Sequence, residues 1–306
     1  MTSPECMASC RRARWRSRPA PEAIRFDQKD MSMSRLTLAH LTASATPAET
    51  IAAAAEAGFD AVGIRICPRR PGDAYAGTVL GDAAALTALR QLLRNTGIPL
   101  SNVSAYQFYP EVRWEDVEPV LDATAELGGE LIVANGFDPE LTRFAEILSR
   151  YAEGAAARGI RVALEFMPYS AVRTVGEAEA MVARCAAPNL GILVDSLHLD
   201  RSGGTAEEVA RLPAERISFA QLCDARRLRQ PASAQELMQE ARTSRLPLGE
   251  GELPLDAFMA ALPQGLELEY EVARSDLIHG TAVDRARAAK ADADRFLARA
   301  PVGRFV

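Results

Sequence analysis

Short apolar runs alternate with longer amphipathic stretches along the chain from Leu36 onward. The runs are rich in Leu, Ile and Val, which is typical of strands buried on both faces of a parallel sheet. In the stretches between them, apolar residues recur at helical spacing, and a glycine ends several of the stretches. The pattern therefore predicts repeated strand–helix units joined by short turns.

Eight such units follow one another. The expected strands are 36–41, 61–66, 100–108, 130–135, 161–166, 190–195, 217–222 and 266–272. The expected helices are 47–57, 82–95, 115–127, 139–158, 175–185, one after Gly203-Gly204, 233–242, 255–262 and 283–299. Eight units predict the α/β class and a single closed (β/α)₈ TIM barrel. An open doubly wound sheet is the competing fold, but no strand-to-helix turn carries G-x-G-x-x-G.

The chain divides into two parts by composition. Residues 1–34 mix Arg, Ser and Pro without helical or strand periodicity, and we expect a disordered N-terminal extension there. A transit peptide is the alternative, but the segment lacks an amphipathic pattern. Translation from upstream of a start at Met31 or Met33 would also explain it. Residues 35–306 are expected to form the catalytic barrel.

Charge and cysteine content exclude several classes of protein. Residues 36–306 hold 27 basic and 37 acidic side chains, a net charge of −10 that disfavours binding to nucleic acid. No apolar run approaches the roughly 18 residues of a membrane span. The five cysteines include no C-x-x-C pair, which is typical of a reducing, cytoplasmic compartment.

Four consecutive strands carry an acid or an amide at or near their C-terminal ends. These residues are Glu165, Asp195, Gln221 and a glutamate of the last strand. In a barrel the four ends lie side by side on one rim, where enzymes of this fold hold their chemistry. Three acids that converge there would repel one another unless a cation lies between them. An all-oxygen set suits Mg²⁺ or Mn²⁺, so we expect a divalent metal site.

The last strand offers three glutamates for this site. Its leucine, tyrosine and valine positions alternate and face the helices, so Glu267, Glu269 and Glu271 face the barrel interior. Glu271 lies nearest the C-terminal rim, and we predict it as the ligand, with Glu269 as the fallback.

Motifs around these acids resemble a known group of enzymes. They are Glu165-Phe166-Met167-Pro168, Val194-Asp195-x-x-His198, Gln221-x-x-Asp224-Ala225 and Arg245-x-x-x-Gly249-Glu250-Gly251. From about residue 35 to 300 the chain is similar to the sugar phosphate isomerase/epimerase family of xylose isomerase-like TIM barrels. The resemblance implies metal ligation by Glu165, Asp195, Gln221 and Glu271. Many members have histidine where this chain has Gln221, which favours Mn²⁺ or Mg²⁺ over Co²⁺ or Zn²⁺.

The resemblance also implies an activity. Enzymes of this group move a proton beside a carbonyl, so we expect an isomerase or epimerase of a small sugar, sugar phosphate or keto-polyol. Glu165 and Glu271 would transfer the proton from opposite sides of the substrate, and His198 would bind a substrate oxygen or donate a second proton. Homodimers are common among such barrels. A related branch of multi-zinc DNA endonucleases is rejected, because this chain has only His40, His198 and His279.

Two other functions stay open. Related barrels are lyases that dehydrate keto-polyols such as inososes or dehydroshikimate, and some of them use glutamine as a metal ligand. A non-catalytic barrel that binds a sugar or a partner subunit is the third possibility.

Four residues are candidates for binding the substrate. Arg65 closes the second strand, and Arg242 and Arg245 flank the glycine-containing loop, so each could bind a carboxylate or phosphate. Tyr169 follows the Glu165 strand and could form a wall of the pocket.

Overall fold

The computed structural model describes residues 34–274 and 280–299, so the expected extension at 1–34 lies outside the described residues except for Ser34. Eight parallel strands close into one barrel in sequence order, and β8 pairs back with β1. The strands are β1 (Leu36–Leu38), β2 (Ala61–Ile64), β3 (Leu100–Phe108), β4 (Leu131–Gly136), β5 (Arg161–Glu165), β6 (Leu190–Asp195), β7 (Ile217–Leu222) and β8 (Leu268–Tyr270). The predicted (β/α)₈ barrel is confirmed.

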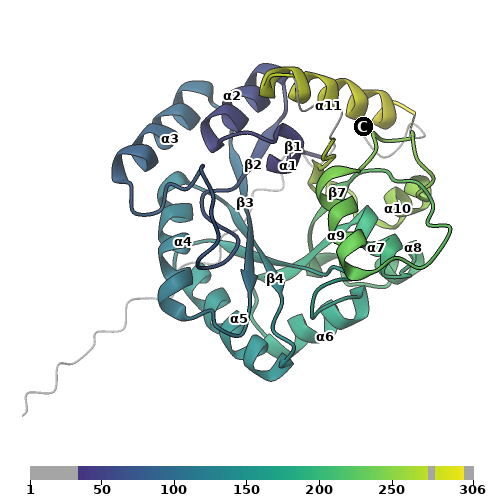
Figure 1. Ribbon diagram of the computed structural model, residues 1–306, viewed down its shortest axis with the longest axis horizontal. Coiled ribbons are helices and arrows are strands. Elements are labelled where there is room, and N and C mark those ends of the chain that lie inside the picture. The colour runs from purple at the N-terminus through teal and green to yellow at the C-terminus, as the bar shows by residue number, and fades with distance from the viewer. Residues whose placement is uncertain (1–33, 275–279, 300–306) are drawn as a thin grey trace, which may run out of the picture. The chain divides into compact units, whose positions relative to one another are not determined.

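Helices surround the barrel as an outer ring (Figure 1). They are α2 (Pro47–Ala57), α3 (Ala83–Thr96), α4 (Trp114–Leu127), α5 (Leu141–Ala156), α6 (Val175–Cys185), α8 (Ala206–Ala210), α9 (Ala234–Thr243), α10 (Leu255–Ala261) and α11 (Ala282–Leu297). Three short elements were not expected from the sequence: α1 (His40–Ala43), α7 (Ser196–Arg201) and the 3₁₀ turn η1 (Ala214–Arg216). Two of them, α1 and α7, follow directly after strands at the C-terminal rim and carry histidines that line the pocket.

The first long helix begins and ends as its sequence predicts. The Thr46 side chain accepts a hydrogen bond from the Glu49 backbone N–H, and the Glu49 carboxylate accepts one from the Thr46 backbone, with Pro47 at the first helical position. The helix ends at Gly58, whose φ of 79° lies in the left-handed region that glycine adopts without strain. The capping box therefore sets the direction in which α2 leaves the rim.

Strand register places the polar residues of the interior at matching heights. Asn135 of β4 lies level with Glu165 of β5, and Gln221 of β7 lies level with both Asp195 and Glu269. Below this level the interior contains the buried apolar cluster Leu131, Val133, Ala163, Leu193 and Phe219. Because this cluster fills the barrel, the polar site opens only toward the C-terminal rim.

Glu267 closes the opposite, N-terminal end of the barrel. Its carboxylate accepts hydrogen bonds from Arg35 and from the hydroxyls of Thr37 and Ser101, and Arg35 also bonds Glu130 at 2.9 Å. Glu267 is therefore bonded to other side chains at the end of the barrel away from the C-terminal rim, unlike Glu271.

None of the helices within 34–274 and 280–299 has the length and apolar character that crossing a lipid bilayer requires.

Gly63 of β2 allows the interior to close tightly. A Cβ atom at this position would collide with the Glu269 carboxylate and would approach Asn102 Oδ1 to 2.8 Å. We expect Gly63→Ala to lower the free energy of unfolding by about 1–3 kcal/mol, because those side chains are buried and bonded to each other. Urea unfolding would measure the change.

Gly176→Ala is the matched control for this substitution. Gly176 lies exposed in α6, and a Cβ atom there would have no neighbouring atom within 4 Å. Because alanine is the better helix former, the control should be neutral or slightly stabilising. Equal destabilisation by both substitutions would contradict the role of Gly63.

Candidate active site

Three of the four predicted metal ligands line one pocket at the C-terminal rim, and the fourth, Asp195, lies next to Glu165. Glu165 ends β5, Asp195 ends β6, Gln221 lies in β7, and Glu271 follows β8 directly. All four are buried. The pocket has a volume of about 470 Å³ with its open mouth included, and Glu165, Gln221, Glu271 and His198 are among its lining residues. The neighbouring strands thus bring the predicted set together.

Asp195 holds the start of the short helix that follows its strand. Its Oδ1 accepts hydrogen bonds from the backbone N–H groups of Leu197 (2.7 Å) and His198 (3.0 Å), so the carboxylate caps α7. This cap turns His198 toward the barrel axis, where its Nε2 lies 3.6 Å from Glu165 Oε1. One ligand atom each from Glu165, Asp195 and His198 lies within 4.8 Å of the other two.

Arg245 occupies the space between two of the acids. Its guanidinium is 2.6 Å from Asp195 Oδ2 and 3.0 Å from Glu271 Oε2, and its Nε donates to the Ala241 carbonyl. The residue is only 3% exposed. It was predicted as a substrate-binding residue and it lines the pocket; because both carboxylates engage its guanidinium, we infer that it also positions them.

Gln221 is held so that its oxygen stays free. Its Nε2 donates to Glu269 Oε2 at 2.6 Å, and the other Glu269 oxygen accepts from Asn102 at 2.8 Å. Gln221 Oε1 is buried and has no hydrogen-bond partner among the described residues. Glu269 lies one level below the pocket and orients Gln221, whereas Glu271 lines the pocket. This geometry favours Glu271 over Glu269 as the fourth ligand.

The buried acids differ in their tendency to ionise. Burial and the charges of Glu271 and Asp195 raise the pKa of Glu165 to about 8. Burial also raises the pKa of Glu271 to about 7, although Arg245 opposes this shift. For Asp195 burial opposes ionisation, but the Arg245 guanidinium overcomes it and holds the pKa below its usual value. Burial lowers the pKa of His198 to about 4, which leaves its imidazole neutral.

These residues fit a bound divalent cation. A buried amide oxygen without a partner is rare in proteins, and a metal ion would satisfy Gln221 Oε1. A cation would also lower the raised pKa values of Glu165 and Glu271, because it favours the charged form of each carboxylate. Glu165, Asp195, Gln221 and Glu271 together present oxygen donors, which suit hard ions.

The remaining predicted residues differ in their placement. Tyr169 lines the pocket and packs edge-on against His198, with ring centroids 5.5 Å apart. Arg242 also lines the pocket, from the last turn of α9. Arg65 is not among the pocket-lining residues, and its guanidinium stacks on the Tyr75 ring at 3.6 Å.

Several pocket residues were not predicted from the sequence, and three of them bear on the chemistry. Arg69 follows β2, His40 begins α1, and Asn135 near the end of β4 donates a 2.7 Å hydrogen bond to Glu165. Asn135 could have been found, because it lies at the end of a predicted strand beside Glu165. Arg69 and His40 lie beyond the ends of their strands, and periodicity does not determine where such residues point.

Asp224 explains the glycine motif of the following loop. Its buried carboxylate accepts hydrogen bonds from the backbone N–H groups of Gly249 (3.0 Å), Gly251 (2.9 Å) and Leu253 (3.0 Å). The loop also pairs with the strand end through Asp224 and Leu246, next to Arg245. The motif therefore has a structural role, because it fixes the loop that places Arg245.

Comparison with known proteins relates the chain to one family of barrels. A family model described as xylose isomerase-like TIM barrel matches residues 51–299. A 3-dehydroshikimate dehydratase of Pseudomonas aeruginosa is 28% identical over 271 residues, which cover 82% of this chain and 40% of that protein. The chain thus spans about two fifths of the length of that relative.

Solved structures share the same fold. An IolI protein with a bound zinc atom has a TM-score of 0.72 at 19% identity, over 88% of this chain and 99% of that one. A D-allulose 3-epimerase from Methylomonas sp. has a TM-score of 0.64 at 17% identity, over 87% of this chain and 98% of that one. At these identities the likeness concerns the fold.

Proposed function

Because this chain belongs to the family of xylose isomerase-like TIM barrels, we propose that it is a divalent-metal-dependent dehydratase of a small cyclic keto-polyol. The observation that carries the proposal is the ion pair between Arg245 and Glu271, at 3.0 Å. The dehydratase from Pseudomonas aeruginosa supports the same reaction class. The sequence favoured an isomerase or epimerase, and the dehydratase was its first alternative.

The ion pair between Arg245 and Glu271 affects which residues can transfer protons to and from the substrate. An epimerase of the expected kind needs two carboxylates on opposite sides of the substrate that both exchange protons. Here one of the two, Glu271, has its Oε2 engaged at 3.0 Å by the buried Arg245 guanidinium, which opposes the rise in its pKa that burial causes. Glu165 and His198 lie together on the other side, 3.6 Å apart. Acid–base groups on one side suit an elimination better than an epimerisation.

Glu165, Asp195, Gln221 and Glu271 would hold the metal ion. When bound, the ion supplies a positive charge that polarises the substrate carbonyl and makes the neighbouring C–H bond more acidic. The oxygen donors favour Mn²⁺ or Mg²⁺ as the ion. The IolI protein of the same fold holds a zinc atom, so Zn²⁺ is the alternative.

His198 is the residue best placed to move the proton. Its neutral imidazole accepts the proton from the carbon beside the carbonyl, and the electron pair of that C–H bond forms a carbon–carbon double bond. The C–O bond at the next carbon breaks with its own electron pair passing to the leaving oxygen, and that oxygen takes the proton back from the imidazolium and departs as water. Glu165 Oε1 stabilises the transient positive charge on the ring.

Proton NMR of reactions in D₂O tests the proposal. The Mn²⁺-loaded protein is incubated with 3-dehydroshikimate and, separately, with an inosose. A dehydratase produces new alkene or aromatic signals, whereas an isomerase exchanges the proton beside the carbonyl without loss of water. Exchange alone would overturn the dehydratase in favour of the epimerase, and no change with any keto-polyol would contradict both.

His198→Gln separates the proton-transfer role from metal ligation. If His198 moves the proton, the variant loses turnover by about 10²–10⁴-fold and keeps its metal, as measured by ICP-MS. Loss of metal in this variant would instead make His198 a ligand, which the 4.8 Å group with Glu165 and Asp195 allows.

An isomerase or epimerase is the second candidate. Glu165 and Glu271 both line the pocket, as that mechanism requires, and solved structures of the same fold include an epimerase. The expected homodimer and cytoplasmic location stay predictions.

A further inference from the structure

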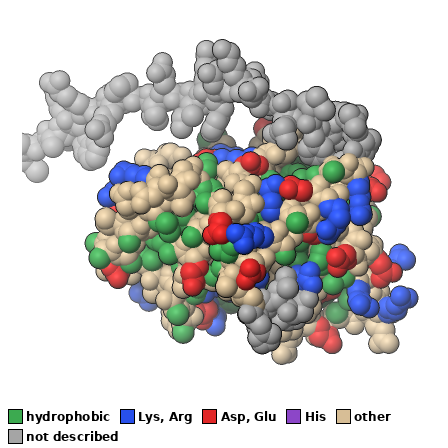
Figure 2. Space-filling view, turned by 90° about the horizontal axis from the view of Figure 1, so that it is seen from above, with side chains coloured by type: hydrophobic (Ala, Val, Ile, Leu, Met, Phe, Trp, Pro, Cys, Tyr) green, Lys and Arg blue, Asp and Glu red, His purple; other side chains and the backbone are tan. Residues whose placement is uncertain are grey.

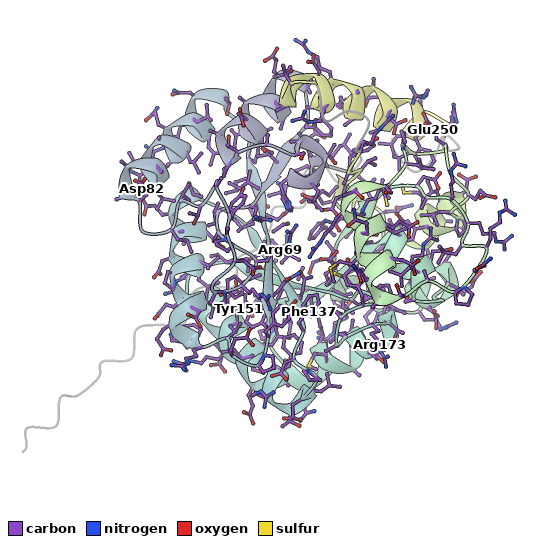
Figure 3. All side chains as sticks on the ribbon, in the orientation of Figure 1. Arg69, Asp82, Phe137, Tyr151, Arg173 and Glu250 are labelled. Carbon is purple, nitrogen blue, oxygen red and sulfur yellow. The ribbon has the colours of Figure 1, made fainter. Side chains whose placement is uncertain are left out.

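Two arginines at the pocket have no acidic partner. Arg69 and Arg242 both line it, and among residues 34–274 and 280–299 no carboxylate lies within ion-pairing distance of either guanidinium. On the face of the molecule drawn in Figure 2, basic and acidic side chains lie side by side. Figure 3 places Arg69 near the centre of the barrel, far from such surface pairs. The pocket thus keeps positive charge that the protein does not neutralise by contact.

The charge of Arg69 is unfavourable in the protein alone. Burial, together with repulsion from Arg65 and Arg242, lowers the pKa of Arg69 to about 10. Glu271 opposes the shift only in part. Arg69 is partly buried, whereas Arg242 is exposed. A partly buried cation without an ionic partner is unfavourable, so the position of Arg69 beside the pocket indicates that an anion from outside compensates it.

His40 gives an independent indication of a ligand. Both ring nitrogens are buried and lack hydrogen-bond partners among the described residues, although the imidazole lines the pocket. Burial and the charges of Arg69 and Arg65 hold the pKa of His40 well below its usual value, so the ring is neutral and carries one N–H donor. Unsatisfied buried donors are rare in folded proteins, and a ligand oxygen would satisfy this one.

His40 and Arg69 face the acids across the pocket, and Arg242 of α9 is close enough to Arg69 to repel it. His40 follows β1 and Arg69 follows β2, whereas Glu165, Asp195 and Gln221 belong to β5, β6 and β7. In the closed strand order these two groups of strands lie on opposite sides of the barrel. A ligand that lies across the pocket would therefore present its carbonyl and hydroxyl oxygens to one side and an anionic group to the other.

We propose that Arg69, Arg242 and His40 bind a carboxylate on the substrate, which is therefore a keto-polyol acid and not a neutral keto-polyol. This inference rests on the proposed function and names the substrate class of the same site. One guanidinium matches a carboxylate with two parallel hydrogen bonds, and an imidazole N–H adds a third. The lining residues include no lysine and no glycine-rich turn, which phosphate sites commonly use.

Calorimetric binding to the Mn²⁺-loaded protein tests the subsite without turnover. The two probes are 3,4-dihydroxybenzoate and catechol, which share a metal-chelating diol and differ only in the carboxylate. We expect the wild type to bind the acid about 10–100-fold more tightly than catechol. Arg69→Met and His40→Asn should reduce this preference to about threefold or less, while catechol affinity stays unchanged and reports an intact pocket.

Arg173→Met is the matched control. Arg173 lies on the loop after β5 at the periphery of the barrel, where its side chain is 64% exposed (Figure 3). The control should keep the full preference for the acid. An equal preference in Arg69→Met and the wild type would overturn the subsite. So would displacement of the acid by millimolar inorganic phosphate from the wild type but not from Arg69→Met, since it would identify a phosphate subsite.

The binding test of the carboxylate subsite and the turnover test of the dehydratase can fail independently of each other. If an inosose is dehydrated and the wild type shows no preference for the acid, the subsite fails and the dehydratase stands. If no keto-polyol is turned over and the acid preference depends on Arg69, the dehydratase fails and the carboxylate subsite stands.

Discussion

Glu165→Gln is expected to abolish metal binding and to lower turnover by about 10³-fold or more. The substitution removes a charge and a ligand oxygen and leaves the volume of the side chain unchanged. The amide oxygen can still accept the 2.7 Å hydrogen bond from Asn135, so the fold should survive. ICP-MS and product formation in the presence of added Mn²⁺ measure the two effects.

Glu250→Gln is the control for this experiment. Glu250 lies exposed on a loop of the same rim, away from the pocket that Glu165 lines (Figure 3). It should retain the metal and the activity of the wild type. If Glu165→Gln binds as much metal as the wild type, the metal site is elsewhere and the proposed chemistry fails with it. Metal content and activity of Asp195→Ala, measured against the wild type in the same way, test a second predicted metal ligand.

Arg245→Met should lower the free energy of unfolding of the metal-free protein by about 3–5 kcal/mol at pH 8. Removal of the guanidinium leaves two buried carboxylates, Asp195 and Glu271, without the cation that lies 2.6 Å and 3.0 Å from them. Methionine fills similar space but offers neither charge nor hydrogen bonds. Urea unfolding in the presence of EDTA measures the difference.

The loss should shrink as the pH falls. In the wild type Arg245 keeps the pKa of Asp195 low, and this contributes stability above the unfolded pKa that is lost as the pH drops through the folded one. In the variant both carboxylates have raised pKa values, so each takes up a proton and the penalty for its charge disappears. Glu271 begins to take up its proton near neutral pH, because its pKa is about 7 even beside Arg245.

Arg287→Met provides the comparison with an ordinary surface pair. Arg287 lies 2.7 Å from Glu56, and both side chains are more than half exposed. This substitution should cost less than about 1 kcal/mol, because water already solvates both charges. A loss as small as this in Arg245→Met would contradict the positioning role of that arginine.

The alternation of apolar runs and amphipathic stretches was sufficient to predict the barrel. A strand buried on both faces leaves a long apolar run, and helical spacing shows in the residues between, so both signals are local in sequence. Boundaries were less certain: the last strand is Leu268–Tyr270, shorter than the expected 266–272, and α5 begins at Leu141, two residues after the expected start. Strand ends depend on pairing with neighbours, which the sequence of one segment does not contain.

Much of the candidate metal site was also readable from the sequence. In a parallel barrel the C-terminal strand ends share one rim, so Glu165, Asp195 and Gln221 had to lie near one another once the fold was known. Alternation along the last strand pointed its glutamates inward, and depth separated Glu271 at the pocket from Glu269 below it. These inferences use only side-chain alternation and barrel closure, which strand periodicity determines.

Only the tertiary structure decided which charges meet. The sequence predicted that a cation lies among the acids, and the structure adds that Arg245, 50 residues beyond Asp195, already lies between two of them. It also brings Arg69 and His40 to the opposite side of the pocket, although neither stood out in the sequence. Both results depend on loops, where no periodicity fixes the direction of a side chain, and ion pairs form between residues that folding brings close in space.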